Sequence, residues 1–227
     1  MPQARRIGVT MRVVRSDYGE TRDALARDWP VLFERLGRWG GYAPDWLMLP
    51  NTGEDCVAFA RRQGVRGLLL TGGDDIGATP DRDATETALL RWAEQEGLPV
   101  MGVCRGAQLL ACQAGARLVP LAPARHVAAR HAVVRLTAAG SAVGLPPAGE
   151  RGEVNSYHAW GLEVAGLPAC LIPQAVCPDD GSVEAFAHAA LPWRGILWHP
   201  EREAVPAPCD LALLHALFTT DRDIRTP

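Results

Sequence analysis

The stretch Leu98-Pro-Val-Met-Gly-Val-Cys104-Arg-Gly-Ala-Gln108 decides the fold of this chain. Its apolar run Val100–Val103 predicts a buried strand, and the residues after the cysteine predict a helix from about Gly106. Gly102 and Gly106 flank Cys104 at the spacing of a nucleophile elbow, a strained strand-to-helix turn that exposes one reactive side chain. A buried, unreactive cysteine at the end of a strand also fits this stretch.

Composition predicts a soluble, folded protein. The chain has 227 residues, of which 48% are hydrophobic, enough for one domain over residues 1–227. Its formal net charge of −3 argues against a nucleic-acid partner, which would need a basic face. We see no secretory signal and no apolar run long enough for a membrane span. The six cysteines form no CxxC pair, so we expect reduced thiols and a cytoplasmic protein.

Apolar strand patterns alternate with helical patterns in the first half of the chain, which predicts an α/β fold with a doubly wound, mostly parallel sheet. Pro30 interrupts the first helical pattern, so that helix is either kinked or starts late. Asp83 with Glu86 three residues later predicts a capping box. The expected strands cover residues 6–10, 46–49, 67–70 and 100–103, and the expected helices run from residue 22 and over 55–63 and 83–96.

Shorter segments punctuated by prolines follow Val119 and predict a short, partly antiparallel extension of the sheet. The expected strands cover residues 132–136, 153–156, 162–164, 183–187 and 195–198. A closing helix is expected around residues 211–218, and residues 221–227 are expected to form a frayed tail.

Functional groups of such sheets collect at the carboxyl ends of the strands. We therefore expect the polar stretch after the first strand, the Gly72-Gly73 turn and Cys104 to share one edge. The glycine-rich turn lacks the motifs of a P-loop or a dinucleotide fold. Its neighbouring carboxylates, Asp74 and Asp75, are interpreted as a solvated turn rather than a metal site.

A cysteine nucleophile needs a base and a group that orients the base. His199 closes an apolar strand, and Glu201 lies two residues further, where an extended chain points to the same side. The alternative is a strand-end histidine beside an unrelated surface glutamate. His158 is the main rival for the base.

Four blocks occur in order along the chain: Leu70-Thr-Gly-Gly-Asp74, Gly102-Val-Cys-Arg-Gly-Ala-Gln108, Asn155-Ser-Tyr-His158 and Trp198-His-Pro-Glu201. This set resembles the class I glutamine amidotransferase family, and within it the γ-glutamyl hydrolase branch of peptidase C26 type. Arg82-Asp83 with Glu86 also resembles a pattern of that branch. The resemblance implies the flavodoxin-like fold of the family, no cofactor and no metal, and a homodimer is compatible with it.

The resemblance also implies roles for single residues. Cys104 would be the nucleophile, His199 the base and acid, and Glu201 its orienting carboxylate. The reaction would cleave a γ-glutamyl amide through a γ-glutamyl thioester. The implied oxyanion hole is formed by Gly72, Gly73 and Arg105, and the implied substrate wall by Gln108, Asn155, Ser156, Tyr157 and His158.

Three functions remain open from the sequence. A free-standing γ-glutamyl hydrolase is favoured by the Cys-Arg-Gly elbow and by the absence of a fused synthetase domain. A glutaminase subunit that delivers ammonia to a separate synthetase, and a non-catalytic binding protein, are the alternatives. Arg12 and Arg15 lie near the expected rim and suit a phosphorylated leaving group, because guanidinium groups bind phosphate well. The stretches Asp17-Tyr-Gly-Glu-Thr-Arg-Asp23 and Trp198-His-Pro-Glu-Arg-Glu203 also resemble the group of enzymes that hydrolyses γ-glutamyl-CDP-amidates. The same arginines could instead pair with nearby carboxylates.

Overall fold

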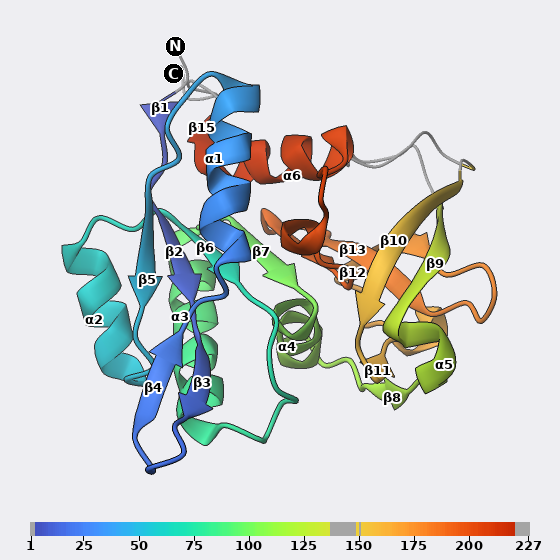
Figure 1. Ribbon diagram of the computed structural model, residues 1–227, viewed down its shortest axis with the longest axis horizontal. Coiled ribbons are helices and arrows are strands. Elements are labelled where there is room, and N and C mark those ends of the chain that lie inside the picture. Colours follow the sequence, from blue (N-terminus) through green and yellow to red (C-terminus); the bar gives the residue numbers. More distant parts are fainter. Residues whose placement is uncertain (1–2, 137–148, 150, 221–227) are drawn as a thin grey trace.

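A computed structural model describes residues 3–136, 149 and 151–220 and is built around one nine-stranded sheet (Figure 1). The strand order is β10-β9-β12-β13-β14-β7-β6-β2-β5. The parallel half contains β14 (Trp193–Ile196), β7 (Val100–Val103), β6 (Gly67–Leu70), β2 (Ile7–Thr10) and β5 (Trp46–Leu49). The antiparallel half contains β10 (Arg151–Tyr157), β9 (Val127–Arg135), β12 (Leu171–Val176) and β13 (Val183–His188).

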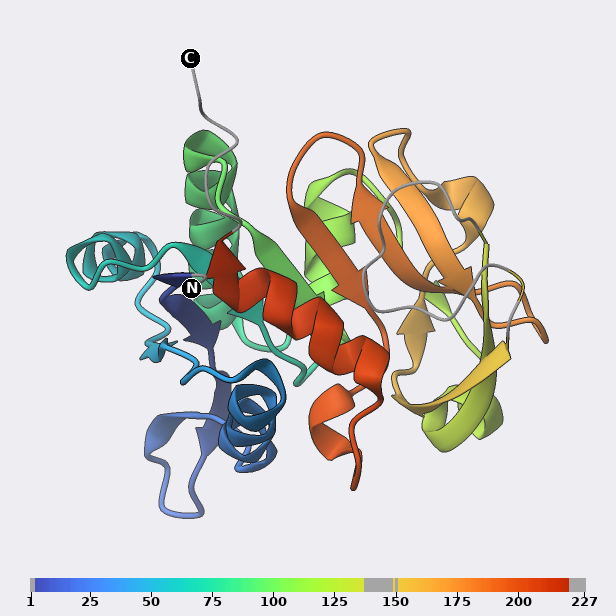
Figure 2. The same ribbon diagram turned by 90° about the horizontal axis from the view of Figure 1, so that it is seen from above.

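Helices cover both faces of the parallel half, as Figure 2 shows from above. Strand residues alternate between the two faces, so Leu68 and Leu70 pack with α2 (Glu54–Arg62), α3 (Pro80–Glu96) and α4 (Arg105–Gln113). Leu69 packs on the opposite face with α1 (Asp28–Gly40) and α6 (Pro208–Phe218). The doubly wound α/β arrangement predicted from the sequence is confirmed.

The remaining elements are short. α5 (Pro123–His126) precedes β9, and two short 3-10 helices, η1 (Val164–Gly166) and η2 (Pro200–Arg202), lie in the second half. Three small antiparallel pairs complete the fold: β1 (Gln3–Ala4) with β15 (Thr219–Thr220), β3 (Arg12–Arg15) with β4 (Thr21–Ala24), and β8 (Val119–Pro120) with β11 (Trp160–Gly161). No helix in the described ranges has the length and hydropathy needed to cross a bilayer. All six cysteines are free thiols.

The first helix starts later than residue 22, because residues 21–24 form a hairpin with residues 12–15. Gly19 makes this hairpin possible, since its φ of 88° suits a tight turn. Pro30 therefore lies in the first turn of α1, where a proline is tolerated. Of the two alternatives weighed for Pro30, the late start is correct.

The predicted capping box at Asp83 is wrong. Helix α3 begins at Pro80, and Glu86 is turned into the protein interior instead of towards the start of the helix. The burial is explained by its ion pairs with two arginines, which no local capping pattern reveals.

The antiparallel half is larger than the short extension that the sequence suggested. Strand β12 was missed because Pro173 lies inside it, at a shift in register where no ladder N–H is needed. The predicted strand over residues 162–164 is wrong, since Val164 starts a 3-10 helix and only Glu163 makes an isolated bridge. The expected frayed tail, residues 221–227, lies outside the described residues.

Candidate active site

The strand-to-helix turn predicted at Cys104 is present. Cys104 directly precedes α4 and has φ 52° and ψ −111°, a strained backbone for a residue with a side chain. Close packing demands the flanking glycines. A Cβ atom on Gly102 would lie 2.6 Å from the backbone N of Ala107, and one on Gly106 would lie 2.2 Å from the carbonyl O of Leu70. The sequence GVCRG therefore forms a tight elbow with the thiol at a helix N-terminus.

His199 and Glu201 form a buried pair beside this elbow. The Nδ1 of His199 donates a hydrogen bond of 2.6 Å to Oε1 of Glu201, and both side chains are almost fully buried. Burial opposes protonation of His199, but Cys104 and Glu201 outweigh it and raise the pKa of the imidazole to about 9. Among the described residues the Nε2 atom has no hydrogen-bond partner, which leaves it available to the thiol.

The Thr71–Gly73 turn, at the carboxyl end of β6, lies against the same pair. A Cβ atom on Gly72 would lie 2.6 Å from Cε1 of His199 and 3.6 Å from Cβ of Cys104, so only glycine fits there. The backbone N–H of Arg105 is the first of α4 and has no acceptor within the helix. Backbone donors of this kind can stabilise negative charge near the thiol.

A network of buried ion pairs and hydrogen bonds supports the elbow. Glu86 accepts hydrogen bonds from Thr10 (2.6 Å) and Arg82 (3.0 Å), and it also pairs with Arg105. Arg82 additionally donates to the carbonyl oxygens of Thr71 (2.7 Å) and Gly72 (3.1 Å). We call Thr10, Arg82, Glu86 and Arg105 the elbow network. It ties the glycine turn, α3 and the elbow together.

Asn155 holds the backbone of His199 from the antiparallel half. Its side-chain amide donates to the carbonyl O of His199 at 2.8 Å, and its Oδ1 accepts from the N–H of His199 at 2.9 Å. The amide also donates to Glu203 at 2.8 Å. This double contact fixes the position of the imidazole, a function that the sequence did not indicate for Asn155.

The other members of the predicted substrate wall differ in placement. Tyr157 is partly exposed, and its ring packs edge-on against that of His199 at 5.7 Å between centroids. Ser156 is buried and donates to the carbonyl O of His126. His158 is buried with its Nε2 near Glu184, at 3.7 Å, and Gln108 donates to the carbonyl O of Trp160 at 2.8 Å. Of the four, Tyr157 has both an exposed side chain and a contact with His199.

The predicted rim arginines are exposed. Arg12 contacts Asp74 at 2.6 Å and lies beside Gly73, 3.4 Å from the position of a Cβ there. Arg15 is exposed at the end of β3. The structure therefore brings the stretch after β2, the glycine turn and Cys104 to one edge of the sheet, as the sequence predicted.

The roles of Thr10, Arg82 and Glu86 were not apparent from the sequence. Arg82 and Glu86 were noticed as a pattern, and their spacing of four residues on a helix was the available signal. That spacing usually marks an exposed pair. Only the fold shows that both side chains are fully buried behind the glycine turn.

The family model for peptidase C26 matches residues 33–201. The chain is 28% identical to γ-glutamyl-CDP-amidate hydrolase of Campylobacter jejuni, over 87% of this chain and 90% of that protein. It is 32% identical to the carbamoyl phosphate synthase small chain of Thermus thermophilus over 67% of this chain, but spans only 34% of that protein.

A solved structure has the same fold. The glutaminase domain of Trypanosoma brucei CTPS with bound acivicin superposes with a TM-score of 0.68 at 17% identity, covering 94% of this chain and 93% of that one. The α/β sheet with its antiparallel extension is thus the class I glutamine amidotransferase fold. Family and relatives together support a hydrolase of the glutamine amidotransferase type. The chain belongs to the peptidase C26 family.

Proposed function

We propose that this protein hydrolyses a γ-glutamyl amide bond through a thioester on Cys104. The observation that carries the proposal is the strained elbow cysteine beside a buried His199–Glu201 pair. A thiol at a helix N-terminus, a base with one free ring nitrogen and a carboxylate on the other nitrogen are the parts of a cysteine hydrolase.

The reaction proceeds in two halves. In the first, the thiol proton passes to His199 before the attack, which leaves the ring as the imidazolium that its raised pKa favours, and the Sγ of Cys104 then attacks the γ-carbonyl carbon. The N–H groups of Arg105 and Gly73 stabilise the oxyanion, the C–N bond breaks, and His199 gives its proton to the leaving nitrogen. In the second half, water attacks the thioester with His199 as base, which releases glutamate and restores the thiol. Glu201 holds the imidazole in the required tautomer throughout.

We further propose a phosphorylated leaving group such as a nucleotide phosphoramidate. The similarity to the C. jejuni hydrolase over most of both chains supports this class. Arg12 lies beside the glycine turn, and its exposed ion pair with Asp74 can be exchanged for a contact with phosphate. Arg15 lies three residues further on the same exposed strand.

A hydrolysis panel tests both parts of the proposal. It compares γ-glutamyl-CDP-amidate, γ-glutamyl-GABA and glutamine. We expect Cys104→Ala to abolish hydrolysis of every substrate, and a wild-type thioester to be trapped on Cys104 by mass spectrometry. Full activity in Cys104→Ala would overturn the mechanism. Activity on glutamine that depends on an added synthetase would favour the glutaminase subunit, to which the likeness to the carbamoyl phosphate synthase small chain points.

The double variant Arg12→Ala/Arg15→Ala tests the leaving group separately. Its KM should rise for the phosphoramidate and stay unchanged for γ-glutamyl-GABA, because the second substrate has no phosphate. Arg38→Ala is the matched control, since Arg38 is an exposed arginine on α1 paired with Glu34. Unchanged kinetics of the double variant on the phosphoramidate would remove the basis for this leaving group.

A further inference from the structure

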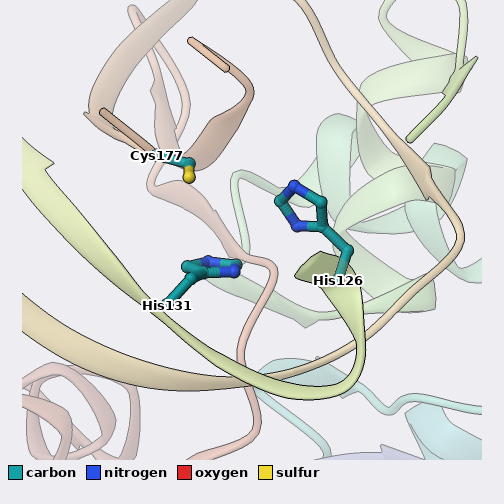
Figure 3. Close-up of side chains that lie close together, drawn as sticks. All are labelled: His126, His131 and Cys177. Carbon is teal, nitrogen blue, oxygen red and sulfur yellow. The ribbon is translucent and has the colours of Figure 1, made fainter. Parts of the chain in front are cut away.

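A group of buried ionisable side chains lies in the antiparallel half, outside the Cys104 site. His126 ends α5, His131 lies on β9, His158 follows β10 and Glu184 lies on β13, and all four are buried. We call them the histidine cluster. Figure 3 shows the rings of His126 and His131 turned into a common space together with the thiol of Cys177.

Within the described part of the chain, the atoms that face this space have no hydrogen-bond partner. They are Nδ1 of His126, Nε2 of His131, Nε2 of His158 and Oε2 of Glu184. Leaving a buried polar atom unsatisfied destabilises the fold, and folded proteins rarely tolerate several such atoms together. A group that accepts electron pairs from all four atoms would remove this destabilisation.

In two of the rings the opposite nitrogen is held by an acceptor, as in histidines that ligate metals. Such acceptors fix the ring orientation and the tautomer, so that the second nitrogen presents its lone pair to the ion. For His126 and His158 the acceptors are Oδ2 of Asp180 at 2.7 Å and the carbonyl O of Trp160 at 3.0 Å. The Nδ1 of His131 makes a longer contact of 3.4 Å with the carbonyl O of Arg125.

The spacing around Glu184 also fits coordination better than hydrogen bonding. The facing nitrogens of His131, His158 and His126 lie 3.4, 3.7 and 3.7 Å from its carboxylate oxygens. Good N–H···O hydrogen bonds are about 2.7–3.2 Å long. Ligand atoms about 2.0–2.1 Å from a tetrahedral Zn²⁺ lie roughly 3.4 Å from one another.

We propose that this cluster binds a Zn²⁺ ion. The ligand atoms of His126, His158 and Glu184 lie within 4.8 Å of one another. His131, whose Nε2 lies 3.4 Å from Oε2 of Glu184, is the fourth ligand and moves towards the other three when the ion binds. Three imidazoles and a carboxylate are ligands that suit zinc, and the burial of all four leaves the site closed, as in structural zinc sites. The Sγ of Cys177 lies within 4.8 Å of ligand atoms of His126 and His131. Its thiolate is the alternative fourth ligand.

Such an ion would join four segments of the antiparallel half. His158 follows Asn155, which clamps His199, by three residues. The carbonyl O of Trp160 accepts hydrogen bonds from both His158 and Gln108. The zinc ion would therefore stabilise the wall that faces the elbow, without contact with the reacting atoms.

The test is the metal content of the wild-type protein, purified without a histidine tag and without chelators. Elemental analysis should find about one zinc per chain. Treatment with a strong chelator should lower Tm, and added Zn²⁺ should restore it. X-ray absorption should show nitrogen and oxygen ligands at about 2.0–2.1 Å.

Variants identify the ligands. His131→Asn and Glu184→Gln should each lose bound zinc, whereas His188→Asn, a histidine outside the cluster, should keep it. Cys104→Ser should also keep it, which excludes adventitious zinc on the reactive thiol. After substitution by Co²⁺, a thiolate-to-metal absorption band that is absent in Cys177→Ser would make Cys177 the fourth ligand.

Two results would overturn the proposal. One is wild-type protein that is folded but free of metal both as purified and after incubation with Zn²⁺ and desalting. In that case the cluster holds shared protons in place of a metal. The other is zinc that stays bound in Glu184→Gln and His131→Asn but is lost in Cys104→Ser. Because both results concern metal content, they are independent of whether the hydrolase proposal holds.

Discussion

Two buried glutamates, Glu86 in the parallel half and Glu184 in the antiparallel half, differ in the charged side chains that surround them. Both side chains are inaccessible to solvent. Glu86 is neutralised by Arg82 and Arg105. Glu184 faces three histidine nitrogens and, among the described residues, makes no ion pair with an arginine. A buried carboxylate needs a positive charge. The chain supplies it to Glu86, whereas we propose that a bound ion supplies it to Glu184.

The largest expected effect comes from removing the charge of Glu86. The variant Glu86→Gln leaves the buried guanidinium of Arg82 without its carboxylate partner and Arg105 with Asp83 alone, which should lower the free energy of unfolding by about 3–5 kcal/mol. Urea denaturation followed by tryptophan fluorescence measures it. Glu34→Gln, which breaks an exposed pair on α1, is the control and should change little. A loss below about 1 kcal/mol in Glu86→Gln would mean that the arginines find other partners.

The next prediction concerns the contact between the two halves. Asn155→Ala removes both hydrogen bonds to the backbone of His199. A small displacement of the imidazole should lower kcat about 10–100-fold with little change in KM. Steady-state kinetics on a γ-glutamyl amide measures this. Glu203→Gln alters the contacts of Glu203 with the Asn155 amide and with Arg130 but leaves both hydrogen bonds to His199, so it should have a much smaller effect. A raised KM with unchanged kcat would instead place Asn155 in contact with substrate, as the sequence suggested.

The third prediction concerns the pH dependence of kcat/KM. Burial opposes the charge of His199, but Cys104 and Glu201 together raise its pKa to about 9. The imidazolium form donates the proton to the leaving group, so kcat/KM should fall about tenfold for each unit above pH 9. Because Glu201 favours the charged ring, the alkaline limb of Glu201→Gln should move to lower pH. An alkaline limb at the same pH in this variant would show that another group controls it.

The parallel half was largely predictable from the sequence. Strands β5, β6 and β7 have the predicted bounds, because their apolar runs are short, continuous and bounded by turns. The elbow was visible for a local reason, since Gly102 and Gly106 are required by contacts within a few residues and with the neighbouring strand. Local patterns report local geometry well.

The antiparallel half and the buried networks were not predictable in the same way. Pro173 hides β12, and the partners of Glu86 come from three separate segments. The histidine cluster joins residues up to 58 positions apart, from His126 to Glu184, with no metal-binding motif in the sequence. His158 was expected at the substrate wall because the Asn155-Ser-Tyr-His158 block resembles that of the family, yet its ring contacts Glu184 on β13 and the carbonyl O of Trp160. The roles of these buried residues depend on partners that are distant in the sequence and become visible only in the fold.

A third buried carboxylate, Asp210 in α6, can be compared with Glu86 and Glu184, and we expect its substitution to have the smallest effect. It accepts a hydrogen bond of 2.9 Å from Trp198 but has no cationic partner in the described part of the chain. Burial raises its pKa from 3.8 to about 6, helped by the charges of Glu203 and Glu201. Lacking a counterion, this carboxylate keeps a proton instead.

The pH dependence of the free energy of unfolding should show whether Asp210 keeps this proton. Between about pH 4 and 6 the folded chain retains a proton on Asp210 that the unfolded chain has released. The contribution of Asp210 to the free energy of unfolding is therefore complete below pH 3.8 and is lost as the pH rises through about 6. Asp210→Asn keeps the acceptor for Trp198 and carries no charge. Relative to wild type, it should therefore gain at least about 1 kcal/mol of unfolding free energy between pH 4 and pH 7. Urea denaturation at both pH values measures the difference. An equal difference at both would show that Asp210 is already ionised at pH 4, and that a single indole N–H suffices for a buried carboxylate where Glu86 requires two arginines.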